Sequence, residues 1–200
     1  MIDKFQAMHG LVIKKFGSAA AVADALNGVE SDLQACLDQA VGEGLAMAAK
    51  GAFMLTPKGQ QALAAEYPTQ FASLRANAAF AASYGKFEMI NNELKQLITD
   101  WQTMVVAGET VPNDHSNAEH DEKIIAKLGD VHERAEPMLA GLAAALPRLS
   151  RYSARLCAAL DKAESGEINF VSGAKIDSYH TVWFELHEDL LRILDRKRDD

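Results

Sequence analysis

Three histidines and one short polar loop are the features of this chain best suited to chemistry. His115 follows Asn113 and Asp114 in a stretch rich in Gly, Pro and Asn, and functional side chains often lie on such loops. His180 and His187 are seven residues apart, so on a helix they lie on one face, two turns from each other. An imidazole can transfer protons or accept a phosphoryl group near neutral pH. We therefore predict His115, His180 and His187 as candidate catalytic residues.

Two lines of polar side chains accompany these histidines on predicted amphipathic helices. Asn91, Lys95 and Gln102 fall along one edge of an apolar helical stripe. The second line lies on the helix that carries the last two histidines. If both helices face the polar loop, the two lines enclose a polar pocket. The candidate ligand-binding residues of this pocket are Asn91, Lys95, Gln102, Asn113, Asp114, Tyr179 and Trp183.

Each of these residues also has a structural interpretation. A single histidine at a helix boundary is commonly a hydrogen-bonded structural residue, Asn and Asp are typical of turns, and Tyr and Trp belong first to the core. The spacing of His180 and His187 is too long for the chelating i, i+4 pair of zinc helices, so we predict no metal site. The sequence has no Gly-rich phosphate loop, Walker lysine, nucleophile elbow or HExxH motif. We therefore expect no cofactor and no independent catalysis.

The first 66 residues predict a small module of short helices and one hairpin. Ser18 is a predicted N-cap, and after a turn Leu33 and Leu37 mark a helix with one buried face. A hairpin follows, and Thr56 begins the next helix, which extends through Leu63. This order is that of a winged helix-turn-helix module over residues 1–66.

The rest of the chain, residues 67–200, predicts a helical bundle domain, so the expected fold class is mainly α. Apolar residues at spacings of three and four predict helices over about residues 87–102, 124–146, 149–163 and 178–193. A turn over residues 108–116 separates the first two helices. Pro137 predicts a kink or break in the second, and Asp177 or Ser178 caps the last.

The charge balance argues against DNA as the ligand. The chain has 20 Lys and Arg against 28 Asp and Glu, a net charge of -8. The second helix of the predicted helix-turn-helix carries Glu30, Asp32, Asp38 and Glu43 but no Lys or Arg. Because DNA binders gain most of their nonspecific affinity by neutralising phosphates, this helix would be repelled from a duplex. DNA binding is therefore disfavoured.

The cysteines and the N-terminus bear on location. Cys36 and Cys157 each fall in an apolar helical pattern, which predicts buried thiols in a reducing compartment and no disulfide. The sequence has neither an apolar run long enough to span a membrane nor a signal peptide at its start. We expect a cytoplasmic protein with no membrane partner.

Several motifs resemble those of a known family. Residues 55–59 (LTPKG) resemble the end of winged-helix modules in MarR-like bacterial regulators. Residues 99–102 (TDWQ), 112–115 (PNDH) and 177–189 (DSYHTVWFELHED) resemble a family of MarR-like bacterial proteins over nearly the full chain. That family is loosely associated with phosphoenolpyruvate-utilising enzymes of the pyruvate phosphate dikinase type. The resemblance implies that the last three motifs form a shared site for a small molecule or a partner, carried by the candidate residues named above.

These observations favour a noncatalytic accessory or ligand-binding protein that does not bind DNA. We expect the winged module to dock a protein partner, such as an enzyme subunit, or a second copy in a homodimer, and the bundle to bind a small polar or phenolic ligand. The resemblance implies a subunit of a phosphoenolpyruvate-utilising or dikinase-type phosphorylating enzyme. Two alternatives stay open: a MarR-like ligand-responsive transcriptional regulator, and an enzyme subunit in which a histidine moves protons or a phosphoryl group.

Overall fold

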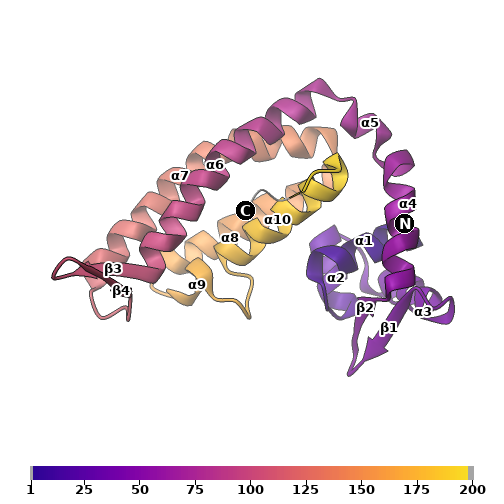
Figure 1. Cartoon of the computed structure of the whole chain (residues 1–200), viewed down its shortest axis with the longest axis horizontal. Coiled ribbons are helices and arrows are strands. Elements are labelled where there is room, and N and C mark those ends of the chain that lie inside the picture. The colour runs from indigo at the N-terminus through magenta and orange to yellow at the C-terminus, as the bar shows by residue number, and fades with distance from the viewer. Residues whose placement is uncertain (1, 198–200) are drawn as a thin grey trace. The chain divides into compact units, whose positions relative to one another are not determined.

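The computed structural model describes residues 2–197, and the chain is mainly helical, as predicted (Figure 1). Within that range there are ten α-helices, one short 3-10 helix and two antiparallel sheets of two strands each. The described chain divides into two compact units: unit 1 is residues 2–77 with 185–197, and unit 2 is residues 78–184. The domain boundary expected after Glu66 lies inside a helix of unit 1. No helix in the described part of the chain has both the length and the apolar composition needed to cross a membrane.

Unit 1 contains three helices, a hairpin, two further helices and the later part of the last helix. Its elements are α1 (Lys4–Lys14), α2 (Ala19–Leu26), α3 (Glu30–Gly42), β1 (Ala46–Ala49), β2 (Ala52–Leu55), α4 (Pro57–Gln70), α5 (Ala72–Arg75) and α10 (Tyr179–Leu194) from Glu185 onward. Helix α1 packs against α2, α3, β2 and α4, which places Met8, Leu11 and Leu63 in the core.

Two predicted caps of unit 1 are confirmed. The Ser18 hydroxyl accepts a hydrogen bond from the Ala21 N–H at 3.2 Å, and the Thr56 hydroxyl accepts one from the Gly59 N–H at 3.1 Å. Each bond satisfies one of the free N–H groups at the start of a helix. Side-chain caps that can be recognised in the sequence therefore define where α2 and α4 begin.

Helix α4 is longer than its sequence suggests. It was expected to extend through Leu63, but it continues through Pro68 to Gln70. Leu63 and Tyr67 are both buried and lie four residues apart, so the buried face of the helix continues past the expected end. Burial of Tyr67 outweighs the one helix hydrogen bond that Pro68 cannot donate.

Unit 2 is built from long helices and a second hairpin. Its elements are α6 (Ala78–Gln102), β3 (Thr103–Val106), β4 (Glu109–Pro112), α7 (Ala118–Ala145), the 3-10 helix η1 (Pro147–Leu149), α8 (Ser150–Glu164), α9 (Asn169–Ser172) and the start of α10. Helices α6 and α7 lie side by side, and α8 packs on α7 (Figure 1). Their buried residues include Phe80, Phe87, Leu94, Leu128 and Leu142.

The structure differs from two local expectations for the bundle. The first part of the turn expected over 108–116 is strand β4, which pairs with β3 in a hairpin. Val105 and Val106 of this hairpin are exposed. The helix α7 is not broken at Pro137, because the helix on both sides of the proline stays packed through Ala135, Met138 and Leu139.

The expectation of two buried thiols was wrong. Cys157 is exposed and Cys36 is half-buried, and both are free thiols. In α8 the buried neighbours are Leu156 and Ala159, and position 157 points away from that face.

Candidate functional site

The structure brings two predicted site residues, Asn113 and His115, together with a buried aspartate. The Nδ1 atom of His115 lies 2.9 Å from Oδ2 of Asp121, and Nδ2 of Asn113 donates to Oδ1 of Asp121 at 2.9 Å. Because a carboxylate only accepts hydrogen bonds, Nδ1 of His115 carries a proton and donates it. In the neutral ring, Nε2 is then the acceptor. A histidine held in one tautomer by an aspartate is suited to accept a proton or a hydrogen bond at Nε2.

The hairpin and its neighbours fix the position of His115. The Asn113 N–H donates to the Gln102 carbonyl at 2.9 Å, and Asn113 Nδ2 donates to the Trp101 carbonyl at 3.0 Å. The Asn113 side-chain oxygen accepts the His115 N–H at 3.0 Å. His115 has a left-handed backbone (φ 59°), and its ring centroid lies 4.6 Å from that of Trp101. Only a few per cent of non-glycine residues adopt such a φ, so the surrounding contacts must hold it.

Asp114, the third residue of the predicted loop cluster, is exposed and stabilises the turn. Its Oδ1 accepts the Ser116 N–H at 3.0 Å. Hydrogen bonds from the side chain and backbone of Ser116 lower the pKa of Asp114 below its usual range. A side-chain bond from Asp to the backbone N–H two residues later is typical of turns, so Asp114 has a structural role here.

Asn91, Tyr179 and Trp183 lie in the core of unit 2. The Trp183 Nε1–H donates to the Asn91 side-chain oxygen at 3.0 Å, and the Trp183 ring stacks on Phe87 with centroids 5.0 Å apart. The Tyr179 hydroxyl lies 3.2 Å from Nδ1 of His132, and both residues are buried. The polar groups of these three predicted ligand-binding residues thus have protein partners in the core.

Buried His132 makes the stability of unit 2 depend on pH. Burial lowers the pKa of His132 below 6.5 and does the same for His180. Below about pH 6.5 the unfolded chain therefore binds more protons than the folded chain, and the free energy of unfolding falls as the pH falls. The loss is at most about 1.4 kcal/mol per pH unit for each histidine.

We expect His132→Gln to reduce this pH dependence. Urea unfolding can be measured at about pH 7.5 and about pH 5.5, above and below the ordinary histidine pKa of about 6.5. It can be followed by the fluorescence of Trp101 and Trp183, which both lie in unit 2. His120→Gln is the control, because His120 is only half-buried and bonds a backbone carbonyl. Equal pH dependence in the wild type and His132→Gln would contradict the expectation.

The remaining predicted site residues differ in burial and in the unit to which they belong. Lys95 and Gln102 are exposed on α6, and Gln102 contacts the His115 cluster through its backbone oxygen. His180 is half-buried in unit 2, whereas His187 is buried in unit 1. Between residues 2 and 197, no three His, Cys, Asp or Glu side chains are arranged as metal ligands.

A second polar cluster, in unit 1, was missed by the sequence analysis. His9 Nε2 lies 2.8 Å from Asp189 Oδ1, and His9 Nδ1 lies 3.0 Å from the Tyr67 hydroxyl oxygen. Asp189 is 0% exposed, His9 1% and Tyr67 8%. The Phe71 ring packs edge-on to His9 with centroids 5.6 Å apart. An imidazole thus links a fully buried carboxylate to a phenol, and we call these three residues the Tyr67–His9–Asp189 relay.

The relay has two proton arrangements that fit these distances. In both, His9 Nε2–H donates to Asp189, because the carboxylate only accepts. With a neutral ring, Tyr67 donates its hydroxyl proton to Nδ1. With an imidazolium, Nδ1–H donates to the Tyr67 oxygen, and the Tyr67 hydroxyl donates to an acceptor other than His9.

The segment of α10 that carries Asp189 is held to unit 1 on both sides of that residue. Lys14 Nζ lies 2.8 Å from Glu185 Oε1, and both side chains are largely buried. Arg75 Nε donates to the Ile193 carbonyl at 2.7 Å. These contacts fix Asp189 opposite His9 and place the next turn of α10 beside a pocket.

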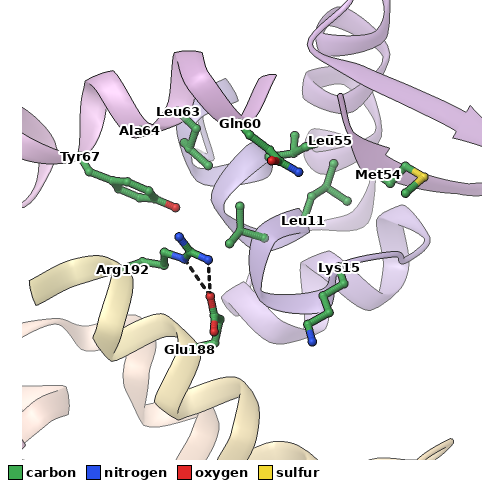
Figure 2. Close-up of a pocket in the computed structure, with 11 residues that line it drawn as sticks. Leu11, Lys15, Met54, Leu55, Gln60, Leu63, Ala64, Tyr67, Glu188 and Arg192 are labelled. Atoms are coloured by element: carbon green, nitrogen blue, oxygen red, sulfur yellow. Dashed lines mark hydrogen bonds and ion pairs between the residues drawn. The ribbon is translucent and has the colours of Figure 1, made fainter. Parts of the chain in front are cut away.

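Tyr67 also lines a pocket of about 370 Å³ in unit 1 (Figure 2). Most of the wall is apolar and comes from α1, β2 and α4, including Leu11, Leu55 and Leu63. Arg192 Nε donates to Glu188 Oε1 at 2.8 Å, and both side chains line the pocket. Figure 2 shows the hydroxyl of Tyr67 directed toward the Arg192 guanidinium. Two cations, Arg192 and Lys15, and the phenol of Tyr67 therefore line a pocket whose wall is mostly apolar.

Sequence reasoning missed the relay because its members are far apart along the chain. His9 is 58 residues from Tyr67 and 180 from Asp189. One indication was available: Phe5 and His9 are four residues apart, which places His9 on the buried face of α1. A histidine on an apolar face needs a buried hydrogen-bond partner.

Comparison of the chain with protein-family models, with curated proteins and with solved structures gives no match.

Proposed function

We propose that the protein binds a small, partly apolar anion in the unit 1 pocket, and that unit 1 is a winged-helix module that does not read DNA. The observation that carries this proposal is that Arg192 and Tyr67 line the same mostly apolar pocket, and that the phenol is hydrogen-bonded to His9, which in turn is bonded to Asp189. Small-molecule sites commonly combine apolar walls with a few placed polar groups. The motif resemblance favours an accessory role for such binding over independent catalysis.

Arg192 supplies the charge for the anion. Its side chain is about half exposed (49%), and it bonds only one carboxylate oxygen, Oε1 of Glu188, at 2.8 Å from Nε and 2.6 Å from Nη2. A guanidinium has five N–H donors, so a ligand carboxylate can use the other donors or displace Glu188. The apolar part of the ligand would contact Leu11 and Leu63.

Tyr67 can add a second hydrogen bond to the anion when His9 is an imidazolium. In that form the His9 Nδ1–H donates to the phenol oxygen, and the Tyr67 O–H donates to the ligand. An anion and a proton at His9 therefore support each other, and binding of the anion should be accompanied by proton uptake. Asp189, 2.8 Å from His9, balances the added positive charge.

Titration calorimetry with benzoate as the probe tests this proposal. We expect Arg192→Gln to weaken benzoate binding about 10-fold or more and Tyr67→Phe about 10-fold, since a hydrogen bond to a charged group contributes about 1.5–3 kcal/mol. Benzamide, which has the same shape without the charge, should bind more weakly than benzoate. Arg134→Gln is the matched control, because Arg134 is also an exposed arginine paired with a glutamate, but in unit 2.

Two results would contradict the anion site. One is equal binding of benzoate and benzamide by the wild type. The other is a benzoate affinity that does not change in Arg192→Gln or that changes equally in Arg134→Gln. Titrations in two buffers of different ionisation enthalpy measure the protons taken up, and Tyr67→Phe should abolish the uptake.

The exposed face of α3 supports the absence of DNA reading. Glu30, Gln34 and Asp38 are exposed on this helix, which contains no Lys or Arg. Just after it, Glu43 binds Lys4 Nζ at 2.6 Å through its carboxylate, and the Glu43 carbonyl accepts Lys58 Nζ at 2.8 Å. The lysines next to α3 are therefore occupied by Glu43, and the helix presents negative charge to a phosphate backbone.

The alternative, a ligand-responsive transcriptional regulator, makes the opposite prediction for DNA. At low salt, fluorescence anisotropy with labelled duplex from the upstream region of its own gene should show no saturable binding. A specific complex that persists as salt is raised would favour the regulator and remove the DNA part of the proposal.

A further inference from the structure

A second pocket, of about 460 Å³, lies in unit 2 beside His115. It is formed by the start of α7, the end of α8 and the segment that follows α8. Ile125 and Ile168 contribute apolar walls. The charged residues that line it are Asp121, Glu122 and Glu164, and no Lys or Arg lines it.

The carboxylates of Glu122 and Glu164 are available to a ligand. Both residues are exposed, and neither has a hydrogen bond or ion pair with another residue of the described chain. Two nearby lysines are engaged elsewhere: Lys123 pairs with Glu119 at 2.7 Å, and Lys162 lies 4.2 Å from the centre of the Phe170 ring. Glu164 is the last residue of α8, where the helix dipole adds negative potential.

His115 gives the pocket a directional acceptor in addition to its charge. Its Nδ1 is bonded to Asp121 at 2.9 Å, and its ring is packed against Trp101. In the part of the chain that the structure describes, Nε2 of His115 has no hydrogen-bond partner. In the neutral ring this nitrogen accepts a hydrogen bond, so a ligand that donates an N–H fits it.

We propose that this pocket binds a small organic ammonium ion with an apolar body. The ammonium group would lie among the carboxylates of Glu122 and Glu164 and donate one N–H to Nε2 of His115. The apolar body would contact Ile125 and Ile168. A carboxylate ligand is excluded, because three acidic side chains line the pocket and no Lys or Arg faces it. The site is independent of the anion pocket in unit 1 and uses no residue of it.

Calorimetric titration of the full chain with benzylamine tests the ammonium site. Benzyl alcohol is the neutral probe of nearly the same shape. We expect benzylamine to bind at least about 10-fold more tightly than benzyl alcohol, and the double variant Glu122→Gln/Glu164→Gln to remove that preference. Both glutamates are exposed, so these substitutions should leave the fold intact, which circular dichroism can verify.

Three further variants distinguish benzylamine binding at this site from nonspecific attraction by negative charge and from binding in the unit 1 pocket. Glu119→Gln removes an exposed carboxylate of the first turn of α7 that does not line the pocket, and benzylamine affinity should not change. Arg192→Gln should also leave it unchanged. His115→Phe keeps a ring against Trp101 and should lower it several-fold. Equal affinity for benzylamine and benzyl alcohol, or equal loss in Glu119→Gln and the double variant, would overturn the proposal.

Discussion

Asp189→Ala should lower the free energy of unfolding by about 3 kcal/mol, because it leaves a buried imidazole without its acceptor. Asp189 is fully buried and lies 2.8 Å from His9 Nε2, so its carboxylate is a hydrogen-bond acceptor for the ring inside the core. The cost combines the desolvation of an unpaired N–H with the loss of a charge-assisted hydrogen bond. Because the change removes only one small side chain, the cavity that it leaves lowers the free energy of unfolding by less than the lost polar contact does.

Urea unfolding followed by circular dichroism measures this effect. Both tryptophans, Trp101 and Trp183, lie in unit 2, so their fluorescence alone would not report on unit 1. Asp38→Ala is the matched control, since Asp38 is an exposed aspartate on α3 and should change stability by less than about 0.5 kcal/mol. Similar unfolding midpoints for the two variants would show that the His9–Asp189 contact does not stabilise the fold.

The helices of the chain were largely predictable because their signals are local. Ser18 and Thr56 cap helices through bonds to N–H groups three residues away. Leu33 and Leu37 are buried at the spacing that the helix geometry requires. The errors occurred where distant contacts decide the outcome. Tyr67 is held by the core on which α4 packs, so α4 does not end where its local composition changes.

The candidate sites were predictable only in part, for the same reason. Asn113 and His115 meet because they are neighbours on one turn, but their shared partner, Asp121, belongs to the following helix. Tyr179 and Trp183 were chosen for their polar atoms, which the core satisfies with His132 and Asn91. Helical periodicity places a residue on a face of a helix, and it does not show which side chain of another helix lies opposite.

Gly59→Ala should destabilise unit 1 by about 3 kcal/mol, although alanine favours helices over glycine. Gly59 is near the start of α4, and a Cβ atom there would overlap the carbonyl oxygen of Leu45. That carbonyl cannot easily withdraw, because it accepts the Thr56 N–H at 3.0 Å and the Thr56 hydroxyl at 3.1 Å. Circular dichroism in urea measures the loss.

Gly42→Ala provides the control that separates crowding from helix propensity. Gly42 is also helical, at the end of α3, and apart from its chain neighbours and the backbone of its own helix no atom lies within 4 Å of the position its Cβ would take. It should be neutral or stabilising by up to about 1 kcal/mol. If Gly59→Ala were as stable as Gly42→Ala, close packing of α4 on Leu45 could not explain the glycine of the LTPKG motif. If only Gly59→Ala loses stability, the two residues of the motif have separate roles. Thr56 caps α4 and bonds the carbonyl of Leu45, and Gly59 allows α4 to approach that carbonyl closely.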